Sequence, residues 1–81
     1  MKIRINSTVD GDSFTFCEIV NGLDSTIVSE KYKTSSRATK EAINWAYDKK
    51  VKIEYLTGPG VNEYLARKAG IVVKSNVKRR V

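Results

Sequence analysis

Hydrophobic and polar residues alternate along the first third of the chain, which is the two-residue period of half-buried β-strands. Lys2 to Asn6 predicts a first strand, Ser13 to Val20 a second, and Thr26 to Lys33 a third. Asp10-Gly11 and Asn21-Gly22 lie between them. Such pairs are typical of two-residue hairpin turns, whose central residues both need positive φ. We therefore expect an antiparallel meander of three strands.

The period changes to that of a helix after Thr34-Ser35-Ser36, whose side-chain oxygens can cap the first free helical amides. From Arg37 to Lys49, apolar residues recur every three or four positions and predict a helix with one apolar side. This apolar stripe consists of Ala38, Ala42, Trp45 and Ala46, with Ile43 at its margin. The small alanines allow close approach to a sheet, and Trp45 is expected to supply most of the buried area.

A second strand and helix follow. Val51 to Leu56 predicts a fourth strand, and Gly58-Pro59-Gly60 predicts a turn into a second helix. The apolar stripe of that helix consists of Val61, Leu65 and Ala69, with Tyr64 beside it. Gly70 is suited to the left-handed residue that ends a helix, and Ile71-Val72-Val73 predicts a short last strand.

The predicted order of elements is β-β-β-α-β-α-β. Strands that are joined through a helix in one sheet run parallel, with right-handed crossovers. The predicted fold class is therefore α/β with a mixed sheet: a three-stranded antiparallel meander extended by parallel strands, with two helices packed on the sheet. One domain is expected over residues 1–73, followed by a flexible basic tail over residues 74–81.

This order resembles the core of the ribonuclease H-like fold, in which an antiparallel three-strand meander precedes a helix, a parallel strand, a short helix and a strand. Thr34-Ser35-Ser36-Arg37 is similar to the polar cap before the first helix of that fold. Ile53-Glu54-Tyr55-Leu56-Thr57-Gly58 is similar to the strand that delivers its central aspartate. A fainter resemblance, through Lys40-Glu41-Ala42 and Ala46, is to double-stranded RNA-binding domains, although their leading helix has no counterpart here.

Enzymes of the ribonuclease H-like family hold two magnesium ions with carboxylates on the first strand, on the first helix and at the end of the fourth strand. Here the first strand offers Asn6 or Ser7, and the fourth ends in Thr57-Gly58. Glu41 alone is near the helix position. Two-metal catalysis needs several converging carboxylates. We therefore expect no catalytic residues, no metal site and no cofactor, and a degenerate enzyme of this family is a minor alternative.

Composition narrows the class of protein. With 81 residues, 41% of them hydrophobic and 30% charged, the chain is typical of one small globular domain. No apolar run approaches the roughly 18 residues of a membrane-spanning helix, and the alternating start is unlike a signal peptide. The chain has no histidine, and its single cysteine, Cys17, is expected to be a small buried residue. These features predict a cytoplasmic protein without a membrane partner.

Charge is distributed unevenly. Residues 1–30 carry two basic and five acidic side chains, a net charge of −3, whereas residues 31–81 carry thirteen basic and four acidic ones, a net charge of +9. A basic face of this kind is typical of proteins that bind nucleic acid. The candidate binding residues are Lys31, Tyr32, Lys33, Arg37 and Lys40 near the start of the first helix, and Lys74, Lys78, Arg79 and Arg80 in the tail.

Lysine and arginine contacts to phosphates give affinity without sequence specificity. Tyr32 lies between two lysines, where its ring could stack on an unpaired base. The predicted function is therefore a small, non-enzymatic nucleic-acid-binding protein that prefers RNA, of the phage accessory or regulatory type. Two alternatives stay open: a protein-binding inhibitor of a host nuclease, toxin or RNA–protein complex, and a basic surface that is merely solvated.

Overall fold

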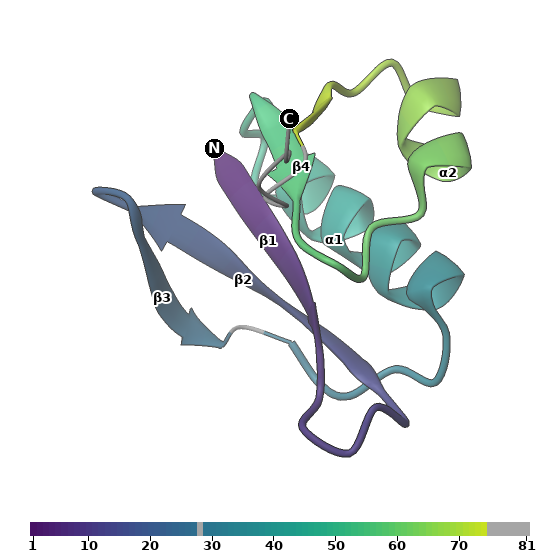
Figure 1. Cartoon of the computed structure of the whole chain (residues 1–81). Coiled ribbons are helices and arrows are strands. Elements are labelled where there is room, and N and C mark those ends of the chain that lie inside the picture. Colours follow the sequence, from purple (N-terminus) through teal and green to yellow (C-terminus); the bar gives the residue numbers. More distant parts are fainter. Residues whose placement is uncertain (28, 75–81) are drawn as a thin grey trace, which may run out of the picture.

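The fold is a five-stranded mixed sheet with both helices on one face (Figure 1). The computed structural model describes residues 1–27 and 29–74 of the 81-residue chain. The elements are β1 (Lys2–Ser7), β2 (Phe14–Val20), β3 (Leu23–Ile27), α1 (Ser35–Asp48), β4 (Tyr55–Thr57), α2 (Glu63–Lys68) and β5 (Val73–Lys74). Within these residues, no helix is both long and apolar enough to cross a membrane.

β1 lies at the centre of the sheet, whose strand order is β3-β2-β1-β4-β5. The pairs β1–β2 and β2–β3 are antiparallel, whereas β1–β4 and β4–β5 are parallel. The antiparallel meander therefore occupies one half of the sheet and the parallel strands the other. This arrangement confirms the predicted fold class.

The predicted third strand has different bounds in the structure. β3 begins at Leu23 and not at Thr26, because Asn21 and Gly22, with φ of 55° and 79°, complete the second turn by themselves. At the first turn only Gly11 has positive φ, so this loop is not the two-residue type that was predicted. Among the described residues after Ile27, Ser29 Oγ accepts a hydrogen bond from the Phe16 amide at 2.8 Å, and Tyr32 forms an isolated bridge with Phe14.

β4 is shorter than the predicted strand from Val51 to Leu56. Its parallel pairing with β1 starts with Lys2 opposite Tyr55. Met1 is therefore the only residue left in the first strand's direction to pair with the residues that precede Tyr55. The carbonyl of Met1 accepts a hydrogen bond from the Glu54 amide at 2.7 Å. The fourth strand therefore begins where the first strand does. The last strand is also displaced, to Val73–Lys74.

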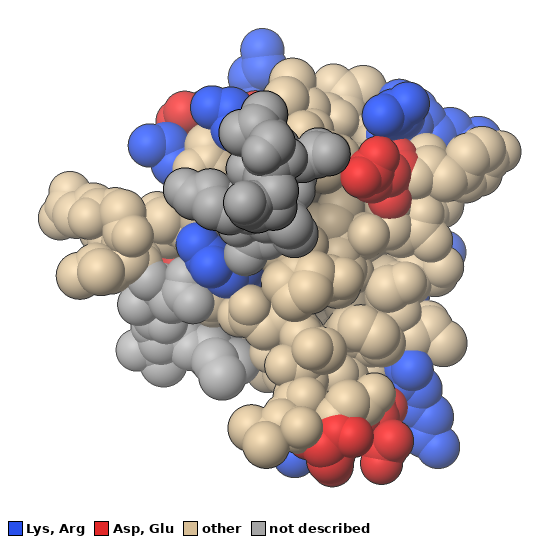
Figure 2. Space-filling view, viewed as in Figure 1, with Lys and Arg blue, Asp and Glu red and all other residues tan. Residues whose placement is uncertain are grey.

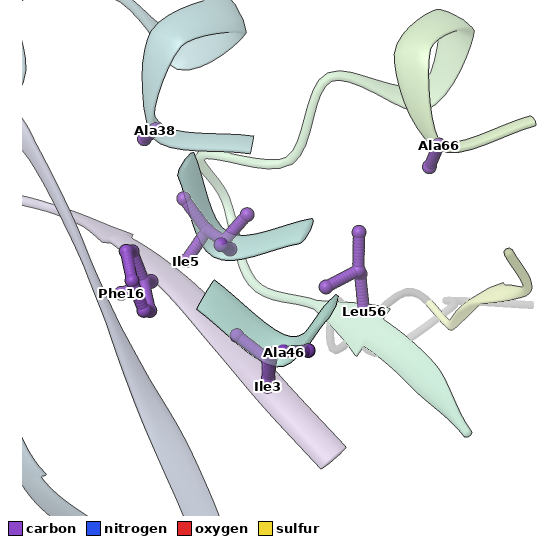
Figure 3. Close-up of a cluster of buried hydrophobic side chains, with 8 residues drawn as sticks. Ile3, Ile5, Phe16, Ala38, Ala46, Leu56 and Ala66 are labelled. Carbon is purple, nitrogen blue, oxygen red and sulfur yellow. The ribbon is translucent and has the colours of Figure 1, made fainter. Parts of the chain in front are cut away.

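The core joins aliphatic side chains of the sheet to alanines of the helices. Figure 3 shows Ile3, Ile5 and Leu56 of the sheet beside helical alanines and Phe16 of β2. The fully buried alanines are Ala38, Ala42, Ala46 and Ala66. Trp45 is only partly buried and packs its ring on Phe16, with centroids 5.6 Å apart. Trp45 therefore packs against the core, as predicted, but at its margin, while the alanines occupy the space between α1 and the sheet.

Asn62 ties the start of α2 to α1. Its Oδ1 accepts from the Leu65 amide at 3.1 Å and caps α2, while its Nδ2 donates to Ser36 Oγ at 2.7 Å. The Asn62 backbone amide donates to Oγ1 of the fully buried Thr39 at 2.9 Å. These bonds set the rotation of α2 about its axis, so that Ala66 is buried and the predicted inward residue Ala69 is exposed.

The Gly58-Pro59-Gly60 turn lies directly on β1. The Gly60 amide donates to the Ile5 carbonyl at 2.9 Å. Gly58 has a φ of 103°, and a Cβ there would clash with the Ile5 carbonyl oxygen. A Cβ at Gly60 would come within 2.9 Å of the Ile5 and Phe14 side chains. Both glycines are therefore needed for this close approach of backbone to backbone.

We predict that Gly58→Ala destabilises the fold more than Gly70→Ala does. Both glycines have positive φ, at 103° and 76°, so alanine suffers backbone strain of about 1 kcal/mol at either position. Only at Gly58 does the new Cβ also meet a backbone carbonyl, which adds about 1–3 kcal/mol. Urea denaturation measures both free energies of unfolding. Equal losses would show that the turn can move away from β1.

We predict that Thr39→Val lowers the free energy of unfolding by about 1–3 kcal/mol, because the partly buried Asn62 amide loses its acceptor while the side-chain volume at position 39 stays nearly the same. Thr39→Ser is the matched control. Serine keeps the hydroxyl and loses one methyl group, which costs about 1 kcal/mol. A valine variant as stable as the wild type in urea would contradict the proposed role of this hydrogen bond.

Candidate nucleic-acid interface

The candidate site begins where the chain rejoins the sheet at Tyr32. The Tyr32 amide and carbonyl each form a 2.7 Å hydrogen bond with Phe14. Its ring lies parallel to that of Phe16, with centroids 6.3 Å apart and planes at 4°. Successive side chains of an extended segment point to opposite sides. Because the Tyr32 side chain packs against the core, the residues before and after it in the chain, Lys31 and Lys33, point away from the core and are exposed.

Three cations from two parts of the chain line one surface hollow of about 400 Å³. They are Lys31, Lys33 and Arg37, and we call them the basic cluster. Thr34 separates the lysines from α1, and its Oγ1 accepts from the Arg37 amide at 3.0 Å. This cap places Arg37 in the first turn of α1, next to the two lysines. The positive end of the helix dipole adds to their attraction for an anion.

Carboxylates surround the basic cluster and offset part of its charge. Arg37 Nε donates to Glu41 at 3.1 Å, and Glu30 lines the same hollow. Lys31 also borders a neighbouring hollow that contains Asp10. The pKa of Asp10 is lowered by hydrogen bonds from the Thr8 hydroxyl and the Asp12 amide, and also by the charge of Lys31. Acidic and basic side chains likewise lie next to each other at the lower end of Figure 2.

Tyr32 is held in its neutral form at physiological pH. Burial raises the pKa of the Tyr32 hydroxyl above its ordinary value of 10.0, and the charges of Glu41 and Glu30 raise it further, whereas Arg37 lowers it. One face of the ring is already taken by Phe16. Tyr32 therefore positions the lysines, and at most its second face could meet a base.

Two of the other predicted binding residues, Lys40 and Lys74, do not line the hollow of the basic cluster. Lys40 lines a different hollow, between α1 and α2, with Leu65 and Lys68. Lys74 is on β5, at the opposite edge of the sheet from β3, and its Nζ lies 4.7 Å from the centroid of the Tyr55 ring. Lys78, Arg79 and Arg80 lie outside the described residues. Of the described members of the predicted set, Lys31, Tyr32, Lys33 and Arg37 line one hollow.

Sequence reasoning missed the cations on the sheet face opposite the helices. Lys2 and Arg4 alternate with the buried isoleucines of β1, and the register places them beside Tyr55 and Thr57. The pattern that identified β1 as a half-buried strand already contained this signal. Thr57, at the end of β4, is where the resemblance to ribonuclease H-like enzymes would place a carboxylate. Among the described residues, no group of three Asp, Glu, Cys or His side chains could hold a metal ion.

Comparisons with family models, with curated proteins and with solved structures each found no match to this chain. The functional proposal therefore depends on the positions of the side chains themselves.

We predict that Tyr32 ionises above pH 10.0. An ultraviolet titration of the wild type should therefore contain one tyrosine transition above this pH that is missing from the titration of Tyr32→Phe. The folded protein holds this proton more tightly than the unfolded chain does. The resulting stabilisation is complete below about pH 10 and is lost as the pH rises through the raised pKa. Unfolding free energies above pH 10 should thus fall less steeply in Tyr32→Phe.

Glu41→Gln provides the control for this assignment. It removes a negative charge that raises the pKa of Tyr32, so the pKa should move down towards its ordinary value. A Tyr32 pKa that is unchanged in Glu41→Gln would show that the carboxylate is not close to the phenol in solution.

Proposed function

We propose that this protein is a non-enzymatic nucleic-acid-binding protein that holds the phosphates of single-stranded RNA on its basic cluster. The supporting observation is that Lys31 and Lys33, in the segment before α1, and Arg37, in its first turn, line one hollow at the start of a 14-residue helix. Lysine and arginine side chains bind phosphate oxygens directly, and the helix terminus favours the same negative charge. No base-specific contact is needed for this mode of binding.

The size and surroundings of the hollow favour a flexible strand over a duplex. A hollow of about 400 Å³ accommodates a local bend of the backbone, whereas a rigid duplex needs a longer basic face. Asp10 beside Lys31 and Glu41 beside Arg37 would repel additional phosphates on either side. We therefore expect contact with about three phosphates, and a salt slope of about −2 in the logarithm of affinity, since each phosphate of a single strand contributes about −0.7.

A regulatory or accessory role of the phage type, in the cytoplasm, is part of the same proposal. It is supported by the small size of the domain and by the nature of the cluster, which presents cations and a neutral phenol. Two of the nearby carboxylates are engaged, Glu41 with Arg37 and Asp10 with the Thr8 hydroxyl. General acid–base catalysis most often uses histidine, which this chain lacks.

The test is fluorescence anisotropy with a labelled single-stranded RNA of mixed sequence, the matching DNA and the RNA duplex, each across a salt series. The cluster variant is Lys31→Glu/Lys33→Glu. A second variant, Lys52→Glu/Lys68→Glu, makes the same change of charge elsewhere on the surface, and we call it the groove variant because both lysines line the groove described in the next section. We expect the cluster variant to lose about tenfold or more in affinity and the groove variant to stay within about twofold.

Equal losses in the two variants would show that binding follows net charge and not the basic cluster. Binding that is absent, or independent of salt, would remove the proposal. Equal affinities for the single-stranded RNA and the DNA would remove the preference for RNA.

A further inference from the structure

A second surface lies between the two helices. It is mainly apolar, whereas the basic cluster is charged. A hollow of about 330 Å³ is lined by Lys40, Ile43, Asn44, Leu65, Lys68 and Ala69. A second hollow of about 220 Å³ shares Ile43 and Ala69 with it and extends to Tyr47, Val51 and Ile71. We call the two together the helix groove. The groove exists because α2 has six residues and α1 has fourteen, so that α2 can cover only part of α1.

The floor of the helix groove is apolar and accessible. Ile43 and Leu65 are only half-buried, and Ala69 is exposed. Tyr47 is 81% exposed and Val51 41% exposed at the far end, and neither belongs to the core. Apolar surface that is left in water at a groove between helices is typical of a binding site for another protein.

The charged residues that line the helix groove are all positive. Lys40 and Lys68 line the part between the helices, and Lys52 lines the extension. The described lining residues include no aspartate or glutamate. Lys68 also lies over the exposed ring of Tyr64, with its Nζ 5.6 Å from the ring centroid. A ligand that fits must therefore bring apolar side chains for the floor and negative charges for the lysines.

We infer that the helix groove is a docking surface for an acidic amphipathic segment of a partner protein. Leucine or isoleucine side chains of that segment would pack on Ile43, Leu65 and Ala69, and its carboxylates would pair with Lys40, Lys52 and Lys68. Nucleic acid also carries negative charge, but its flat bases need aromatic faces for stacking, whereas this floor is mainly aliphatic. The inference does not depend on the RNA-binding proposal, because the two surfaces use different lysines.

The experiment uses a labelled synthetic peptide of about 16 residues with leucine at helical positions i, i+3, i+4 and i+7 and glutamate at most others. One control peptide has the same composition in an order that breaks the apolar stripe. A second has lysine in place of glutamate. Anisotropy gives the affinities, and amide NMR spectra of the full chain identify the residues that contact the peptide.

We expect the acidic peptide to bind the wild type and to shift the amides of residues 40–47 and 64–71. The groove variant Lys52→Glu/Lys68→Glu should lose about fivefold or more in affinity, since it reverses two charges at the rim. The cluster variant Lys31→Glu/Lys33→Glu should bind the peptide as the wild type does. Tyr47→Ala tests the apolar contact, and because Tyr47 is 81% exposed it should leave the thermal unfolding midpoint unchanged while weakening the peptide complex.

Three results would overturn the inference. One is an absence of binding between the acidic peptide and the folded wild-type protein. Another is equal affinity for the shuffled or lysine-containing peptide, which would show that neither the stripe nor the charge is recognised. The third is a map in which single-stranded RNA, and not the acidic peptide, shifts the amides of the helix groove.

Discussion

The arrangement of the second half of the chain depends on the close contact between the Gly58-Pro59-Gly60 turn and β1. The Gly60 amide is bonded to the Ile5 carbonyl at 2.9 Å, and neither glycine has space for a Cβ. This contact sends the chain from β4 over the end of β1 towards α1. Asn62 then meets Ser36 and Thr39, so that the start of α2 is held against α1. The contact between this turn and β1 therefore fixes β4 beside β1 and sets the position of α2.

The small residues on the inner faces of both helices determine which larger side chains lie at the surface. Because Ala38, Ala42, Ala46 and Ala66 fill the space above the sheet, larger side chains such as Trp45 and Ile43 lie at the margins of the core. Tyr32 is also marginal, and its contact with Phe16 holds the neighbouring lysines outward. Both proposed surfaces are therefore consequences of how the core is packed.

The two surfaces meet on α1 but differ in chemistry. Arg37, in the first turn, belongs to the basic cluster, whereas Lys40, one turn later, lines the helix groove. The cluster consists of cations, whereas the groove combines apolar side chains with cations. An RNA strand and an acidic protein segment could therefore occupy the chain together. This arrangement would reconcile the two functions, RNA binding and protein binding, that the charge pattern of the sequence leaves open.

The sequence by itself determined the order of the elements, the antiparallel meander and the inward face of α1. These features follow from local periodicity and turn chemistry, which need no knowledge of distant residues. Only the tertiary structure decided where β3 and β4 begin and end, that Ala66 and not Ala69 is buried, and that Lys40 and Lys74 lie away from Lys31. The reason is that strand register, helix rotation and the grouping of surface charges depend on contacts between residues far apart in the chain, such as Lys2 with Tyr55 and Thr39 with Asn62.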